Sequence, residues 1–166
     1  HESSRALRHA LYVESFDRAE TTVPGRTQGA WLLVAPTFAL AFAEALASAL
    51  YDAGAAHVHI IAGSGSRKEL VGALTLAADT QWTSVLTLTP LDAEPVQGGV
   101  VSSGLLQTLV LAQALGEMGV AAPLWVLTAG AVCAAEGDDP PQPLQAMAWG
   151  LCRALAQENA ECWGGL

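Results

Sequence analysis

The sequence predicts a three-layer α/β fold, in which helices cover both faces of a mostly parallel sheet. Short, continuous apolar runs such as residues 30–34 (AWLLV) have the length and composition of strands that are buried on both faces. Along the chain they alternate with longer segments rich in alanine and leucine, and this alternation is typical of parallel strands joined by helical crossovers. The 166 residues suffice for one such domain, of about five strands, but not for two ordinary domains.

The amino-terminal segment, residues 1–29, is expected to hold one strand and a linker. Residues 10–15 (ALYVES) predict the strand, which we place at a sheet edge. Residues 17–29 are polar and contain a Pro-Gly pair, which predicts a loop. The remaining residues, 30–166, are expected to form the α/β core of a single domain over 1–166.

The core begins with the strand at 30–34 and continues into a helix predicted over residues 38–51. Alanine and leucine give this segment a high helix propensity. Thr37 directly precedes it, and threonine is a favoured N-cap residue. Gly54 follows it, at a position where glycine commonly ends a helix.

A second strand–helix unit and a third strand follow. Residues 57–61 (HVHII) are rich in β-branched side chains and predict a strand, and residues 67–78 carry the apolar stripe of a helix. The glycines and serines of 63–66 predict the turn between them. Residues 84–88 predict the third strand, and the prolines and glycines of 89–100 predict a loop.

The carboxyl-terminal part predicts two further units. Leucine and valine cover well over half the circumference of a helix over residues 102–118, which indicates burial on two sides. A strand over 123–128 follows, then a loop, and then a helix over 144–159 with one apolar face. Residues 163–166 (WGGL) are expected to enter another strand. This order of elements predicts a Rossmann-like sheet with right-handed crossovers.

The composition excludes two classes of partner and points to a third. Apolar residues make up 52% of the chain and charged residues 14%, whereas soluble domains usually carry about a quarter charged residues. We therefore expect a partner to cover part of the surface. The net charge of −9 repels nucleic acid, so we expect none to bind. No apolar run reaches the roughly 18 to 20 residues that span a bilayer, so we expect no membrane contact.

The cysteines predict neither disulfides nor a zinc site. Cys133, Cys152 and Cys162 are odd in number, and no Cys-x-x-Cys pair occurs. Cys152 falls within a helical pattern and is expected to pack as a small apolar residue. These features fit a reducing compartment, the cytoplasm.

The turn that would bind a dinucleotide in a Rossmann-like fold lacks the residues for it. Glycines after the first core strand normally let the backbone approach the pyrophosphate. Here that turn is APTF, in which Pro36 has no amide hydrogen and Phe38 would crowd a phosphate. We therefore expect no cofactor-binding residues in this chain.

The proton donor of a carbonyl reductase is missing as well. In the reductases of this fold, a tyrosine four residues before a lysine donates a proton because the cation lowers the pKa of the phenol. The chain has one lysine, Lys68, and Ser64 stands four residues before it. The tyrosines, Tyr12 and Tyr51, have no lysine at that spacing. We expect no catalytic residues and no such chemistry by this chain alone.

Four weaker patterns leave alternatives open. Gly63-x-Gly65, which Lys68 follows, could be a displaced phosphate loop, but a turn that caps a helix is the simpler interpretation. Arg67 could meet the 2′-phosphate of a dinucleotide. His57 and His59 could share a metal ion, but no third ligand is placed by spacing, and structural histidines are favoured.

The other two candidates are polar residues near loops. Glu136, Asp138 and Asp139 could bind a cation, although a solvated acidic run is the simpler interpretation, so we expect no metal. Thr128 follows the fourth core strand, where reductases often carry an active-site serine, but without the tyrosine and lysine it makes no catalytic set.

Six stretches in order carry a resemblance to a known family. The chain resembles the ketoreductase region of modular type I polyketide synthases, and specifically its amino-terminal, structural subdomain. The matching stretches cover nearly the whole chain and are GAWLLV (29–34), ALASALYDA (45–53), GLLQTLVLAQAL (104–115), APLWVLTAGAV (122–132), WGLCRALA (149–156) and WGGL (163–166).

The resemblance implies a truncated, short-chain-reductase-like Rossmann domain without chemistry of its own. In this family a second, catalytic half binds NADPH, carries the serine, tyrosine and lysine, and reduces a β-ketoacyl group. The first half braces it. The implied partners are that catalytic half and neighbouring synthase domains. The apolar helix surfaces would then form the interface, through Leu105, Leu109, Leu115, Leu144, Met147, Leu151 and Leu155. A small-molecule-binding or transferase domain on the same fold is the alternative.

Overall fold

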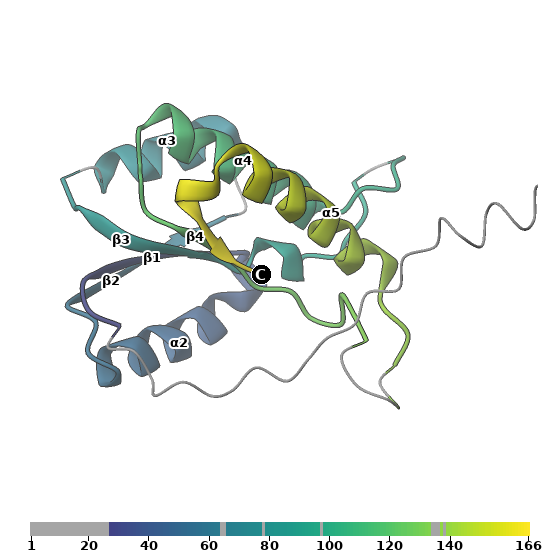
Figure 1. Ribbon diagram of the computed structural model, residues 1–166, viewed down its shortest axis with the longest axis horizontal. Coiled ribbons are helices and arrows are strands. Elements are labelled where there is room, and N and C mark those ends of the chain that lie inside the picture. The colour runs from purple at the N-terminus through teal and green to yellow at the C-terminus, as the bar shows by residue number, and fades with distance from the viewer. Residues whose placement is uncertain (1–26, 64–65, 78, 97, 134–136, 138) are drawn as a thin grey trace, which may run out of the picture.

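Among the residues that the structure describes, a five-stranded parallel sheet forms the centre of the molecule (Figure 1). The computed structural model describes residues 27–63, 66–77, 79–96, 98–133, 137 and 139–166. Within them the strands lie side by side in the order β2-β1-β3-β4-β5. Their bounds are β1 Ala30–Ala35, β2 His57–Ala62, β3 Trp82–Thr87, β4 Leu124–Val126 and β5 Trp163–Gly165. The predicted strand at 10–15 lies outside the described residues.

In the described part of the chain, four α-helices and three short 3₁₀ turns connect the strands. Their bounds are η1 Thr37–Ala39, α2 Leu40–Asp52, α3 Arg67–Leu76, η2 Thr89–Leu91, α4 Ser103–Glu117, α5 Pro143–Glu158 and η3 Ala160–Cys162. Helix α2 covers one face of the sheet, whereas α3, α4 and α5 cover the other (Figure 1). The helices change face because the chain runs from β1 outward to β2 and then returns across β1 to β3, and right-handed crossovers in opposite directions lie on opposite faces.

The strand order explains in what sense the fold is truncated. A complete dinucleotide-binding sheet has the order 3-2-1-4-5-6. Removing its third strand with the adjoining crossover leaves the order seen here. The predicted α/β, Rossmann-like, three-layer fold is confirmed, and all strand pairs among the described residues are parallel.

The core consists of two apolar layers, one on each side of the sheet. Alternate residues of β1 enter both: Leu32 and Val34 pack under α3, α4 and α5, whereas Leu33 and Ala35 pack under α2. All four are fully buried. Burial on both faces is the reason why this strand is a continuous apolar run rather than an alternating one.

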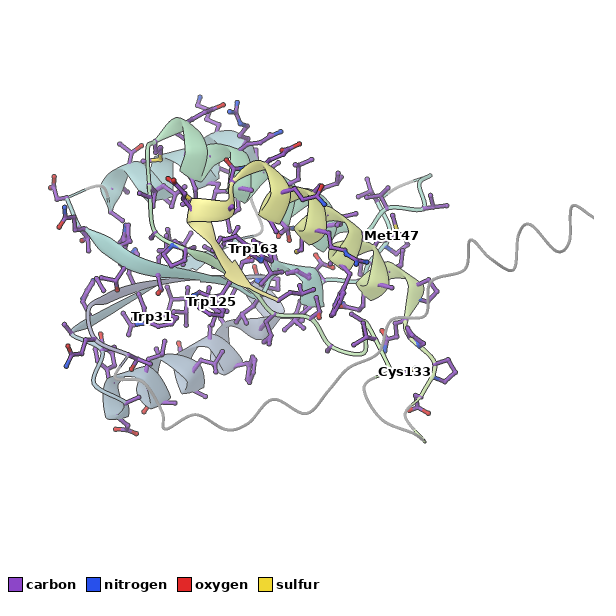
Figure 2. All side chains as sticks on the ribbon, in the orientation of Figure 1. Trp31, Trp125, Cys133, Met147 and Trp163 are labelled. Carbon is purple, nitrogen blue, oxygen red and sulfur yellow. The ribbon has the colours of Figure 1, made fainter. Side chains whose placement is uncertain are left out.

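The face that carries α2 is covered unequally. Trp125, in β4, points to this face and is 41% exposed (Figure 2). Its indole lies against Gly164 and Gly165 of β5, where a Cβ atom would come within 3 Å of the ring. The glycines of the WGGL block therefore let the indole lie flat on the outer strand.

The outer edge of β2 is closed by a side chain of α2. The Tyr51 hydroxyl accepts a hydrogen bond from the Val58 amide at 3.0 Å and lies 3.3 Å from the Val58 carbonyl oxygen, to which it donates. Unpaired amide and carbonyl groups on an edge strand are places where other strands pair. At this residue of β2 both groups are already satisfied.

The start of α2 differs from the sequence prediction. Residues 37–39 form a 3₁₀ turn in which the Ala39 amide donates to the Pro36 carbonyl at 2.8 Å, and α2 begins at Leu40. No side chain caps it, so Thr37 is not its N-cap. Gly54 does end the helix: its φ is +103°, and its amide donates to the Tyr51 carbonyl.

Candidate functional site

The carboxyl edge of the sheet is the first candidate site, since ligands of open α/β sheets bind where the strand order reverses. Here the reversal lies between β1 and β3. Pro36, which follows β1, is buried, and Phe38 is 68% exposed beside it. Thr89 and Pro90, which follow β3, are also buried. The segments that follow β1 and β3 therefore place these four residues on the two sides of the switch point.

A chain of buried hydroxyl groups connects β3 to α4 at this edge. The Thr108 hydroxyl donates to the Gly104 carbonyl at 2.7 Å, so it accepts from Thr89 at 2.8 Å. Thr89 in turn accepts from Thr87 at 2.8 Å, and the Thr87 oxygen accepts the Thr89 amide at 3.2 Å. All three threonines are at most 1% exposed. Each buried hydroxyl thus finds its partners within the fold, which avoids the cost of an unsatisfied polar group.

Two glycines allow the elements around this chain to approach closely. A Cβ atom at Gly104 would overlap the Thr89 carbonyl oxygen and lie 2.7 Å from the Asp92 carbonyl oxygen. One at Gly63 would lie 2.9 Å from the Thr89 methyl group. The first turn of α4 and the end of β2 therefore pack directly on the segment that follows β3.

Gln145 links the loops that follow β3 and β4. Its side chain projects from the first turn of α5 and is 3% exposed. The amide nitrogen donates to the Pro90 carbonyl, and the amide oxygen accepts from the Ala129 backbone amide at 3.2 Å. Thr128, the candidate at this strand end, is half-buried beside this link. Gln145 was not among the sequence candidates, although it shares a helical face with Ala148 and Cys152.

The Gly63–Ser66 turn caps a helix through Ser66. The Ser66 amide donates to the Glu69 carboxylate at 2.7 Å, and the Ser66 oxygen accepts the Glu69 amide at 3.4 Å, which is a capping box. Ser64 and Gly65 lie outside the described residues. Arg67, the candidate for a 2′-phosphate, forms an ion pair with Glu117 of α4.

The remaining sequence candidates do not assemble a metal centre in the described part of the chain. No group of three potential ligands lies together there. The rings of His57 and His59 stack beside Trp82, with centroids 6.0 and 6.2 Å from the indole. Asp139 is exposed, and Glu136 and Asp138 lie outside the described residues.

The cysteines are free, and one of them belongs to the core. Cys152 is 1% exposed and packs in the layer under α4 and α5, as expected of a small apolar residue. Burial raises the pKa of its thiol to about 11, so the thiol stays neutral at physiological pH. Cys133 is exposed and Cys162 half-buried.

The predicted partner-interface residues divide into surface and core. Met147 is 36% exposed, and the other surface members are half-buried on α4 and α5: Leu105, Leu109, Leu144, Leu151 and Leu155. Leu115 is 5% exposed and packs in the core, because it points from α4 toward the sheet. Its main contacts therefore hold α4 on the sheet, and only a small part of its side chain reaches the surface.

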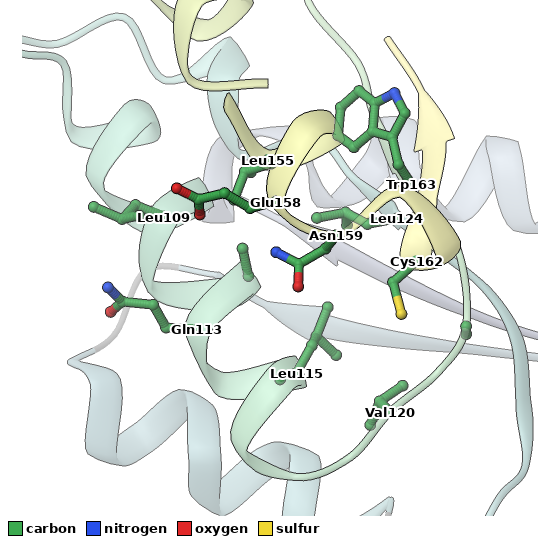
Figure 3. A pocket seen from close by; sticks show the side chains of 13 residues that line it. Leu109, Gln113, Leu115, Val120, Leu124, Leu155, Glu158, Asn159, Cys162 and Trp163 are labelled. Carbon is green, nitrogen blue, oxygen red and sulfur yellow. The ribbon is translucent and has the colours of Figure 1, made fainter. Parts of the chain in front are cut away.

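A groove separates α4 from the end of α5 and the start of β5 (Figure 3). It has a volume of about 290 Å³. Its lining is mainly apolar, with two polar residues at the end of α5, Glu158 and Asn159. Two of the predicted interface residues, Leu109 and Leu155, line it. The sequence did not reveal the groove, because it depends on how the end of α5 packs beside α4. From the sequence, Glu158 and Asn159 are only the end of a helix.

No helix in the described part of the chain is long and apolar enough to cross a bilayer.

Residues 30–163 match a family described as the Rossmann fold domain of the polyketide synthase extender module SpnB. The chain is 40% identical over 148 residues to the polyketide synthase GfsA of Streptomyces halstedii, covering 85% of this chain and 2% of GfsA. It is 34% identical over 156 residues to the erythronolide synthase EryA2 of Saccharopolyspora erythraea, covering 93% of this chain and 4% of EryA2.

Solved ketoreductase structures show the same fold. A C2-type ketoreductase from a modular polyketide synthase superposes with a TM-score of 0.75 and 39% identity, covering 84% of this chain and 31% of that chain. An A1-type ketoreductase superposes with a TM-score of 0.76 and 33% identity, covering 92% of this chain and 32% of that chain. The chain therefore spans about a third of the ketoreductases it matches, and a few per cent of the synthases.

Proposed function

Because the chain belongs to the family of Rossmann-fold domains of polyketide synthase extender modules, we propose that it is the structural, non-catalytic subdomain of a ketoreductase region. In this role it stabilises a catalytic half that reduces a β-ketoacyl group with NADPH. The reduction itself, the cofactor site and the serine, tyrosine and lysine would belong to that half. The brace would hold the catalytic half in its folded state, as one subunit of an oligomer holds another.

The observation that carries the proposal is the packing at the carboxyl edge of the sheet. The groups next to the switch point hydrogen-bond to one another, through the threonine chain and Gln145. Pro36 offers no amide to a phosphate, and Thr89 fills the space beside Gly63. A cavity of about 330 Å³ opens beside these contacts and is lined by Gly63, Ser66 and Thr89. A pyrophosphate at the switch point itself would still have to displace the hydrogen bonds of the threonine chain.

Partly exposed apolar side chains on α4 and α5 also fit the role of a domain that stabilises a partner. Leu106 is 42% exposed on α4, on the side that faces α3, and half-buried Leu109 and Leu155 line the groove between α4 and α5. Apolar side chains that remain partly exposed on two neighbouring helices favour a protein partner over solvent. Neighbouring synthase domains are further candidate partners. A cytoplasmic location stays a prediction, and the three free thiols are what a reducing compartment would leave.

Two measurements on the 166-residue chain test the proposal. Titration with NADPH, followed by nucleotide fluorescence and by thermal shift, should give no saturable signal. Mixing with the separately produced catalytic half should raise the melting temperature of both proteins, because each binds the folded form of the other. An unrelated short-chain reductase serves as the control partner. Saturable micromolar NADPH binding, or no mutual stabilisation, would contradict the proposal.

A further inference from the structure

The groove between α4 and the end of α5, which we term the α4–α5 groove, has the size of an anchor site for one side chain. Small-molecule pockets usually enclose about 300 to 1,000 Å³, and this groove, of about 290 Å³, lies at the lower limit and opens to solvent. Its floor is formed by Leu115 and Leu124 of the core, and its walls by Ala112, Leu109 and Leu155. Such a site suits one large apolar side chain from a partner.

The end of the groove carries negative charge that no ion pair among the described residues neutralises. Glu158 is the last residue of α5, where the backbone carbonyls already give the helix terminus a partial negative charge. The last turn of α5 contains no basic residue, and no ion pair of Glu158 is found among the described residues. Glu161 follows three residues later. A carboxylate at this end of a helix costs stability unless a cation faces it.

The polar side chains extend over the groove rather than away from it. Figure 3 shows the Glu158 carboxylate and the Asn159 amide directed toward α4, above the apolar floor. Both residues are exposed. An apolar side chain that enters the groove would therefore pass close to an acceptor that suits an arginine or lysine.

We propose that the α4–α5 groove receives a segment of the catalytic half in which a large apolar side chain stands next to an arginine or lysine. The apolar side chain fills the groove, and the cation pairs with Glu158 and the carbonyl end of α5. This inference rests on the proposed function and names the contact through which the two halves join. The net charge of −9 argues for a basic partner and against a second copy of this chain, which would bring two acidic ends together.

Two pairs of variants, compared with the unmodified chain for binding to the separately produced catalytic half, test the groove. Ala112→Phe fills it, and Ala45→Phe places the same ring on the exposed side of α2 as a control. Glu158→Lys reverses the charge at its end, and Glu44→Lys does so on α2. We expect Kd by calorimetry to rise at least tenfold for Ala112→Phe and fivefold for Glu158→Lys. The two α2 variants should stay within twofold of the unmodified chain.

The outcomes separate the two proposals. Unchanged Kd for both groove variants, with tight binding by the unmodified chain, would overturn the groove and leave the brace standing. No binding by the unmodified chain would overturn the brace and the groove together. Should Ala112→Phe lower the melting temperature of the chain, the surface variant Glu158→Lys decides alone. Loss of a dimer in sedimentation, rather than loss of the mixed complex, would assign the groove to a second copy and overturn the proposal.

Discussion

At the scale of single residues, Gly104 lies where the first turn of α4 directly contacts the backbone of residues 89–92. The Gly104 amide donates to the Asp92 carbonyl at 3.0 Å, and the Thr108 hydroxyl donates to the Gly104 carbonyl. The space where a side chain would stand is filled by the carbonyl groups of Thr89 and Asp92. Position 104 therefore requires glycine because of contact, although its backbone is ordinary helix.

Gly104→Ala should destabilise the chain by about 1 to 3 kcal/mol, because the added methyl group forces the first turn of α4 away from η2. Gly116→Ala, near the other end of α4, meets nothing within 4 Å and should stabilise the chain by about 0.5 to 1 kcal/mol through helix propensity. Urea unfolding of both variants measures the difference. Equal effects of the same sign would show that contact at position 104 does not decide the outcome.

Single residues also show how much of the candidate site the sequence reveals. The missing glycines and the missing tyrosine–lysine pair are visible in the sequence, and Cys152 is correctly predicted to pack in the core. The contacts of Thr89 and Gln145 were not predicted. Thr89 bonds to Thr108, 19 residues away, and Gln145 bonds to Pro90, 55 residues away. Nothing local in a sequence specifies which distant polar groups a buried side chain meets.

At the scale of elements, α3 and α2 begin in different ways. Helix α3 starts with the reciprocal Ser66–Glu69 capping box, whereas α2 starts from a 3₁₀ turn without a side-chain cap. The pattern Ser-x-x-Glu is a local signal and was available in the sequence. The short turn before α2 was not, since it depends on how Pro36 is held at the end of β1.

We expect Ser66→Ala to destabilise the chain by about 0.5 to 2 kcal/mol, since it removes the oxygen that accepts the Glu69 amide. Ser48→Ala, on the exposed side of α2, is the matched control and should be neutral or slightly stabilising. Chemical denaturation with circular dichroism detection checks both. A loss as small as that of Ser48→Ala would mean that the capping box contributes nothing measurable.

The elements themselves were largely predictable, with errors at their ends. The strands at 30–34, 57–61 and 84–88 and the four helices all exist, because each carries a local apolar pattern, either a continuous run or a periodic stripe. The strand predicted over 123–128 is reduced to Leu124–Val126. Its neighbours still bond to β3: the Pro123 carbonyl accepts from the Val85 amide at 3.0 Å, and the Leu127 amide donates to the Thr87 carbonyl at 2.9 Å. The difference is therefore confined to the ends of the strand.

At the scale of the whole molecule, stability should fall from the centre of the sheet toward its ends. The amides of Leu33 and Val34 in β1 lie between two strands and under helices on both faces. Strand β5 pairs on one side only, among the described residues, and its three residues are half-buried.

Native-state hydrogen exchange should therefore show different protection for the amides of β1 and those of β5. Amides of β1 should exchange only through global unfolding, with a strong dependence on denaturant, whereas those of β5 should exchange through local opening that depends weakly on denaturant. Addition of the catalytic half should slow exchange in β5 and at the end of α5. Uniform protection of all strands in the isolated chain would contradict this order of stability.

The Tyr51 hydroxyl makes the two edges of the sheet different. By satisfying both backbone groups of Val58, it makes one margin unreceptive to an incoming strand, as edge-blocking devices do in natural β proteins. At the opposite edge, no hydrogen bond from a side chain to the backbone of β5 is found in the described part of the chain. Among the described residues, β5 is therefore the edge whose backbone groups an added strand could meet, whereas the Tyr51 hydroxyl already pairs with those of Val58 on β2.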